Sequence, residues 1–179
     1  MKGKVIYCFF FFALNLIFIQ VAKSQCNVNV KKTSEANRYE AAEENLFIYR
    51  GIGDNGQISE GWYGIKGSLA YYVAPNGNSL WRLLIASKAM YFKPLVPRTV
   101  TFTFSNNSKL TIVADNYKQI DGYEVCYYTV AETDISKFSY SINRLEINDT
   151  RQNKTIGKSL EYSNVLSEQY DCIKKELLF

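Results

Sequence analysis

The chain contains no histidine among its 179 residues. Without an imidazole it cannot build a Ser-His-Asp triad, a Cys-His dyad or a zinc site with histidine ligands. Chemistry that depends on two carboxylates, as in glycoside hydrolases, needs only Asp and Glu. The composition therefore excludes the common histidine-dependent hydrolases and leaves a carboxylate-based hydrolase open.

Proline and glycine are scarce, with three and ten residues respectively. They form no Pro-rich, Gly-rich or Ser-rich linker, and the sequence shows no internal repeat. A domain of about 150 residues buries about 68–70% of the surface that its unfolded chain exposes, which is enough for folding without disulfides. We therefore expect a single globular domain.

Residues 1–24 are typical of a secretory signal peptide. Lys2 and Lys4 precede a hydrophobic run over residues 5–21, and Ala22 and Ser24 are small residues at the positions that signal peptidase reads. We predict cleavage after Ser24 and a secreted or periplasmic protein with no membrane span after cleavage.

Two alternatives exist for this N-terminal segment. Uncleaved, it would be a membrane anchor, although its hydrophobic run is at the short end for a span. A lipoprotein would begin at Cys26, but Gln25 is bulky and polar and Lys23 stands where an aliphatic residue is expected. Cleavage before Gln25 without lipidation is the prediction that these residues favour.

The net charge is small once the signal peptide is removed. The whole chain has 21 basic and 17 acidic residues, and the signal takes three lysines and no acid with it. Residues 25–179 therefore carry a formal charge of +1, with no run of Lys or Arg that would follow a phosphate backbone. We predict no nucleic-acid partner.

Three cysteines, Cys26, Cys126 and Cys172, lie after the signal peptide, and none belongs to a C-x-x-C motif. This pattern excludes thioredoxin-like redox chemistry and a thiolate zinc site, and we predict no metal and no cofactor. In an oxidising compartment an odd number of cysteines indicates one disulfide and one remaining thiol. We predict a Cys26–Cys172 disulfide, which would join the two ends of the domain, and a buried Cys126 thiol.

Strand patterns dominate from residue 45 onward. Residues 46–49 and 62–73 are rich in aliphatic and aromatic residues, and the turn sequences 54–56 and 75–77 follow them. The segment 80–85 completes a predicted hairpin, although a helix beginning at Ser79 and ending near Phe92 is an alternative that periodicity alone does not exclude.

The clearest strand covers residues 99–104, where three threonines alternate with Val and Phe. This alternation predicts that Phe102 is buried and that Thr103 is exposed. A turn at 105–108 leads to a strand at 110–114, and Asp121-Gly122 predicts a second hairpin turn before a strand at 123–130.

The remaining sequence predicts one helical turn at 133–138, capped by Thr133 or Asp134, a strand at 142–147, and a final helix capped by Ser163. Serial hairpins with a closing helix indicate a mainly β fold, an antiparallel β-sandwich or curled sheet with a C-terminal α-helix. We expect this β-rich domain to span residues 45–179, with an N-terminal arm or short helix at residues 25–44.

The signal junction, which ends in a small residue followed by Gln25, and the series of strands before a final helix resemble small exported bacterial β-rich proteins of unknown function. The resemblance involves no specific motif. It implies an exported compartment and a β-rich architecture, and it implies no site.

Aromatic residues concentrate in the two neighbouring predicted strands, and Trp62, Tyr72 and Trp81 are the candidate binding residues. Exposed rings would suit the apolar faces of sugars, whereas aromatics in strands also serve as core residues. Glu132 and Asp134 are an acidic pair beside the predicted helical turn, where cap and surface roles are the simpler interpretation.

No catalytic motif is present, and we therefore expect a non-catalytic binding or interaction domain with an unknown protein or glycan partner. A carboxylate-based hydrolase of glycans or cell-wall polymers is the alternative.

Overall fold

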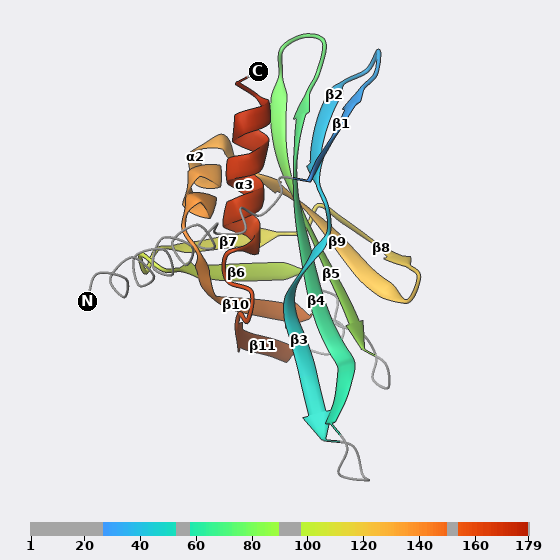
Figure 1. Ribbon diagram of the computed structural model, residues 1–179, viewed down its shortest axis with the longest axis vertical. Helices are drawn as coiled ribbons and strands as arrows, with labels where there is room; N and C mark the ends of the chain where they lie inside the picture. Colours follow the sequence, from blue (N-terminus) through green and yellow to red (C-terminus); the bar gives the residue numbers. More distant parts are fainter. Residues whose placement is uncertain (1–26, 53–57, 90–97, 150–153, 179) are drawn as a thin grey trace, which may run out of the picture.

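The computed structural model describes residues 27–52, 58–89, 98–149 and 154–178. The signal peptide, its cleavage site, Cys26 and the predicted turn at 54–56 lie outside these residues. Within them the protein is mainly β, with antiparallel sheets and a C-terminal helix, which confirms the predicted fold class (Figure 1). No helix in these described ranges is long and apolar enough to cross a membrane.

The larger of two sheets has seven strands in the order β1-β2-β4-β5-β9-β8, and β3 pairs with β4 beside β2. The strands of this seven-stranded sheet are β1 (Val28–Lys32), β2 (Asn37–Ala41), β3 (Glu44–Ile52), β4 (Ile58–Val73), β5 (Ser79–Ala89), β8 (Asn116–Ile120) and β9 (Tyr123–Val130).

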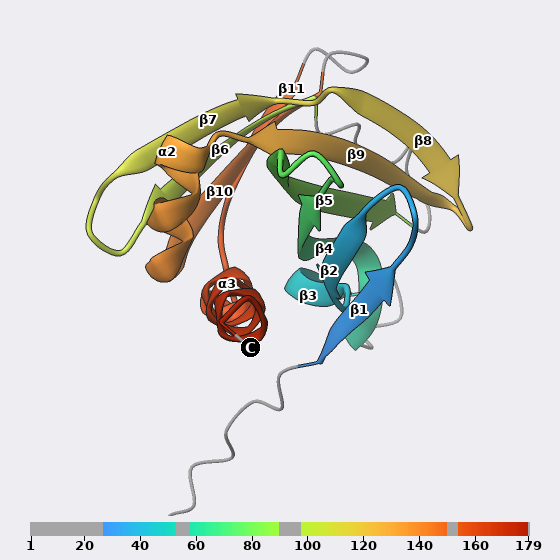
Figure 2. The same ribbon diagram turned by 90° about the horizontal axis from the view of Figure 1, so that it is seen from above.

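The smaller sheet has four strands in the order β11-β10-β6-β7. They are β6 (Thr99–Phe104), β7 (Lys109–Val113), β10 (Ile142–Asp149) and β11 (Lys154–Ser159). The chain passes almost directly from β7 into β8 and so joins the two sheets at one side (Figure 2). The short helix α2 (Glu132–Ile135), the 3-10 turn η1 (Ser136–Ser139) and the helix α3 (Val165–Glu176) complete the fold.

The N-terminal segment differs from the prediction. Residues 25–44 were expected to form an arm or a short helix, but β1 and β2 form a hairpin, and β2 pairs with the end of β4. Four of the five β1 residues are exposed, so no alternation of buried and exposed side chains marks this strand in the sequence. The pairing of β1 with β2, and of β2 with β4, therefore decides the conformation of this segment, and only the tertiary structure supplies these partners.

The β4–β5 hairpin confirms the strand predicted at 80–85 and excludes the alternative helix. Its turn contains Gly77 at a φ of +84°, and the Gly77 N–H donates to the Ala74 carbonyl at 2.9 Å. Glycine adopts this left-handed conformation without strain. Trp81, Leu83 and Ile85 then alternate toward the core, as a strand requires and a helix does not.

The alternation predicted for residues 99–104 is present in β6. Phe102 is fully buried with Val100 and Phe104, while Thr103 lies on the outer side of the sheet and is partly exposed. Asp121 and Gly122 both have positive φ, at 49° and 77°, as a type I′ hairpin turn requires. Local residue preferences therefore predicted these two features correctly.

Both predicted helix caps are wrong. The N-cap of α2 is Ala131 rather than Thr133 or Asp134, and the N-cap of α3 is Asn164 rather than Ser163. Neither N-cap residue makes a side-chain cap hydrogen bond. The backbone provides the physical reason at Ser163, because its carbonyl accepts from Ile142 N–H at 2.9 Å and thereby belongs to the β10 junction.

One hydrophobic core unites both sheets with α3, whose buried side includes Leu166, Tyr170 and Ile173. Gln169 lies on the same buried side. Its Oε1 accepts a hydrogen bond from Leu69 N–H and its Nε2 donates to the Ala42 carbonyl, both at 2.9 Å. Residues 42–43 separate β2 from β3, and the Gln169 amide satisfies backbone groups beside that break.

Candidate functional site

Six cationic side chains gather on the side of the seven-stranded sheet that points away from α3. The register places Lys31 opposite Arg38 and Arg38 opposite Tyr72, and the same alternation continues across β5, β9 and β8. Directly paired residues point to the same side of a sheet. We call this surface the basic face, and its cations and tyrosines are Lys31, Arg38, Lys66, Arg82, Lys88, Lys118, Tyr72, Tyr123 and Tyr127.

The first cluster on the basic face centres on Tyr72. The Arg38 guanidinium carbon lies 5.1 Å from the centre of this ring and that of Arg82 lies 5.9 Å from it. Arg38 also forms an ion pair with Glu40. Burial raises the pKa of the Tyr72 phenol, an effect that the nearby Arg38 charge opposes. The phenol therefore stays neutral while two guanidinium groups lie against its ring.

The second cluster centres on Tyr123. The Nζ atoms of Lys66 and Lys88 each lie 5.0 Å from the centre of its ring. Lys66 comes from β4, Lys88 from β5 and Tyr123 from β9, so the three adjacent strands assemble the cluster. Cation–π attraction to a single ring holds two like charges near each other.

Lys118 and Tyr127 lie between the two clusters at the β8–β9 side of the basic face. The Lys118 Nζ is 5.3 Å from the centre of the Tyr127 ring. The Thr129 hydroxyl donates to Asp115 Oδ2 at 2.8 Å, so one of the nearby carboxylates is engaged locally. Polar and cationic groups thus continue from one cluster to the other.

Small, buried side chains lie beneath the middle of the basic face. Ala86 is 1% exposed although it points away from α3, and Ser68, Ala70 and Val125 are buried in the same way. Because no further layer of the described chain covers this side of the sheet, the longer side chains around these residues bury them. The surface in the middle of the basic face is therefore formed by the longer side chains that pack over these small residues.

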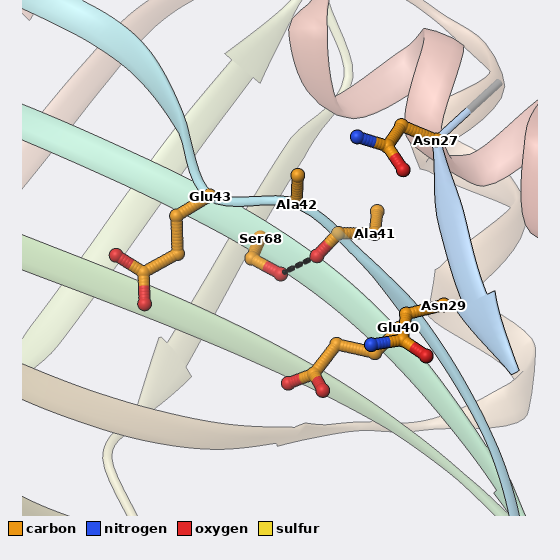
Figure 3. A pocket seen from close by; sticks show the side chains of 7 residues that line it. All are labelled: Asn27, Asn29, Glu40, Ala41, Ala42, Glu43 and Ser68. Atoms are coloured by element: carbon orange, nitrogen blue, oxygen red, sulfur yellow. Dashed lines mark hydrogen bonds between the residues drawn. The ribbon is translucent and has the colours of Figure 1, made fainter. Parts of the chain in front are cut away.

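A pocket of about 320 Å³ borders the basic face where β2 ends (Figure 3). The Ser68 hydroxyl donates to the Ala41 carbonyl at 2.7 Å across its wall. Glu40 and Glu43 both contribute to the lining, and Figure 3 shows their carboxylates as separate groups with no bond between them. The complete lining is Asn27, Asn29, Glu40, Ala41, Ala42, Glu43 and Ser68.

The three aromatic residues predicted as binding candidates do not form one site. Tyr72 lies on the basic face and is partly exposed. Trp81 is 3% exposed on the opposite side of the sheet, where its ring centre lies 4.8 Å from that of Tyr71 and 5.5 Å from that of Tyr170. Trp81 is therefore a core residue. The side chain of Trp62 lies outside the described part of the structure.

The cysteines and the acidic pairs contribute no site to the described chain. Cys126 is fully buried in β9 and forms no disulfide, as predicted, and Cys172 is buried in α3. The Cys26–Cys172 disulfide stays a prediction because Cys26 is outside the described residues. Asp134 Oδ1 accepts from Lys137 Nζ at 2.6 Å, which gives it a surface role. No group of three potential metal ligands occurs among the residues described.

Sequence reasoning missed the basic face. Its cations are isolated in the sequence, and residues such as Lys66, Arg82 and Lys88 become neighbours only through strand pairing. The available signal was the placement of these cations within hydrophobic strands, where a charged side chain must point to solvent. The absence of a basic run in the sequence therefore did not exclude a basic surface.

No protein-family model, curated protein or solved structure matches the chain significantly.

Proposed function

We propose that this protein is an exported, non-catalytic binding domain that holds a negatively charged ligand on its basic face. The observation that supports the proposal is the gathering of six cations on one side of one sheet, in a chain whose residues 25–179 carry a formal charge of only +1. Such an asymmetric distribution attracts anions to that face, although the protein as a whole is nearly neutral.

The geometry of the tyrosines favours an anion over a neutral sugar. Tyr72 and Tyr123 already have two cations within 6 Å of their ring centres. Tyr127, the third tyrosine of the basic face, has Lys118 at 5.3 Å from its ring centre. A pyranose that stacks on one of these rings would compete with a cation for it. The rings therefore hold the cations in position, and the cations are the groups that meet the ligand.

Dextran sulfate, a polymeric anion, is a suitable first probe. We expect saturable binding in calorimetric titration that weakens steeply as salt is added, because exposed charges are screened over about 10 Å at 0.1 M ionic strength. Arg82→Glu, at an exposed position of the basic face, should weaken binding at least tenfold. The matched control is Lys109→Glu, which makes the same charge change at an exposed position of the four-stranded sheet.

Two results would overturn the proposal. One is an absence of binding by the unmodified protein at low salt. The other is an equal loss of affinity in Arg82→Glu and Lys109→Glu, which would mean that net charge rather than the basic face governs binding.

The alternative function, a carboxylate-based hydrolase of glycans, has one observation in its favour. Glu40 and Glu43 line the same pocket, and glycosidases act through two carboxyl groups on either side of a sugar bond. The ion pair of Glu40 with Arg38 keeps one carboxylate engaged elsewhere. Release of reducing ends from cell-wall polysaccharide that disappears in Glu43→Gln would support the hydrolase, and its persistence in that variant would exclude this pocket.

A further inference from the structure

We infer that the ligand of the basic face is a linear acidic polysaccharide that lies along β4 and contacts both tyrosine-centred clusters. This inference rests on the proposed function and specifies its ligand. It is carried by the distance between the clusters, by the cations that lie against their rings and by the exposed polar groups between them.

Each cluster is a position for one acidic group. Arg38 and Arg82 lie against one ring, where Glu40 already pairs with Arg38 and, within the described residues, leaves Arg82 as the unpaired cation for a ligand. Lys66 and Lys88 lie against the other ring. Two like charges held near one ring repel each other, and an anion bound beside them reduces that repulsion. Arginine and lysine both form charge-assisted hydrogen bonds to carboxylates and sulfates.

The two positions are too far apart for one small anion. Lys66 and Tyr72 are both on β4, six residues apart on the same side of the strand. At about 3.3 Å per residue, this separation is roughly 20 Å. A ligand that occupies both clusters must therefore be an extended chain with repeated acidic groups.

The surface between the clusters suits a sugar chain. Longer side chains pack over Ala70 and Ala86, so a polymer would lie on top of these side chains and not in a groove. Thr129, Asn116 and Lys118 are exposed here, where Lys118 provides an ammonium group, Asn116 an amide, and Thr129 a hydroxyl oxygen whose proton is donated to Asp115. Sugar hydroxyls can pair with such groups between the acidic positions.

Single-stranded nucleic acid fits this face less well, although it is also a linear polyanion. Proteins that bind single strands combine a basic groove with aromatic rings on which the bases stack. Two cations lie against each of the Tyr72 and Tyr123 rings and one lies against Tyr127, so stacked bases would compete with cations at every tyrosine of the basic face. The predicted export of the protein also favours a polysaccharide found outside the cytoplasm.

Oligogalacturonides of increasing, defined length test the inference by calorimetric titration at constant ionic strength. Oligomers that reach only one cluster should bind weakly. Affinity should rise by about 100-fold or more once the oligomer spans roughly 20 Å, because the second contact is then made at a high effective concentration. Fully methyl-esterified oligomers of the same lengths, which lack the charges, should not bind.

A double variant, Lys66→Gln with Lys88→Gln, should retain the weak binding of short oligomers at the Tyr72 cluster and lose the steep rise with length. Lys109→Gln, on the other sheet, should leave both properties unchanged. A smooth rise with length that the double variant does not alter would overturn the inference.

Further binding measurements with other polyanions distinguish between the possible classes of ligand. Tighter binding of single-stranded DNA of equal length and charge, or of vesicles that contain phosphatidylglycerol, would also overturn it. If dextran sulfate binds while oligogalacturonides of every length do not, the acidic-polysaccharide inference fails in this form and the proposed anion-binding function stands. If neither probe binds, both fail.

Discussion

Replacing Gln169 by Met tests whether this side chain is needed to hydrogen-bond the backbone groups beside the break between β2 and β3. The Gln169 side chain is 4% exposed and is the hydrogen-bond partner of Leu69 N–H and of the Ala42 carbonyl. Methionine is similarly long and unbranched and has a comparable helix propensity, so the substitution removes the two hydrogen bonds with little change in shape. The expected effect therefore arises from the two backbone groups that lose their partners.

The size of this effect follows mainly from Leu69, which is fully buried, because Ala42 is exposed and water can replace the partner that its carbonyl loses. A buried polar group left without a partner costs about 1–3 kcal/mol, so Gln169→Met should lower the free energy of unfolding by about the same amount through the Leu69 N–H. This loss is a large share of the stability of a typical domain, which is about 5–15 kcal/mol. Urea unfolding followed by circular dichroism measures it as a lower midpoint with an unchanged slope.

Gln119→Met, at an exposed position of β8, is the matched control and should change stability by less than about 0.5 kcal/mol. Gln169→Glu adds a second test, because an ionised carboxylate accepts from Leu69 N–H but cannot donate to the Ala42 carbonyl. Its stability relative to the unmodified protein should recover as the pH falls and the carboxyl becomes protonated. A loss of less than about 0.5 kcal/mol in Gln169→Met would refute the reasoning.

Three other predictions concern the core, the stability of the fold at alkaline pH and the disulfide that would join the termini. Phe102→Ala should cost about 3–5 kcal/mol in urea unfolding, because it empties a fully buried site, whereas Thr103→Ala should stay within about 1 kcal/mol. The reverse order would mean that β6 faces the other way. Burial raises the pKa of the Tyr128 phenol above its ordinary value of 10.0, and the neighbouring Cys126 raises it further. Above about pH 10 the unfolded chain therefore loses a proton that the folded chain keeps, and stability should fall by about 1.4 kcal/mol per pH unit from this group. Tyr128→Phe should remove that contribution, and an unchanged alkaline slope would contradict it. Peptide mapping of exported protein without reduction should find Cys26 bridged to Cys172, and a bridge to Cys126 would show that the predicted pairing is wrong.

Elements whose signals are local could be predicted from the residues alone. The alternation in residues 99–104 indicates which side chains of β6 are buried, because successive side chains of a strand point in opposite directions. Gly77 and the Asp121-Gly122 pair indicate turns, because positive φ angles in turns favour Gly, Asn and Asp. These signals need no knowledge of the rest of the chain.

Features that depend on strand pairing and packing could not be predicted before the folded structure was known. The β1–β2 hairpin forms because β4 offers its edge, and the break at residues 42–43 is satisfied by Gln169, about 100 or more residues along the chain. Tyr71 and Tyr72 must point to opposite sides in any strand, but the position of α3 decides which of them faces solvent. The basic face exists for the same physical reason: Lys66, Lys88 and Tyr123 belong to separate segments, and only the register of β4, β5 and β9 brings their charges around one ring.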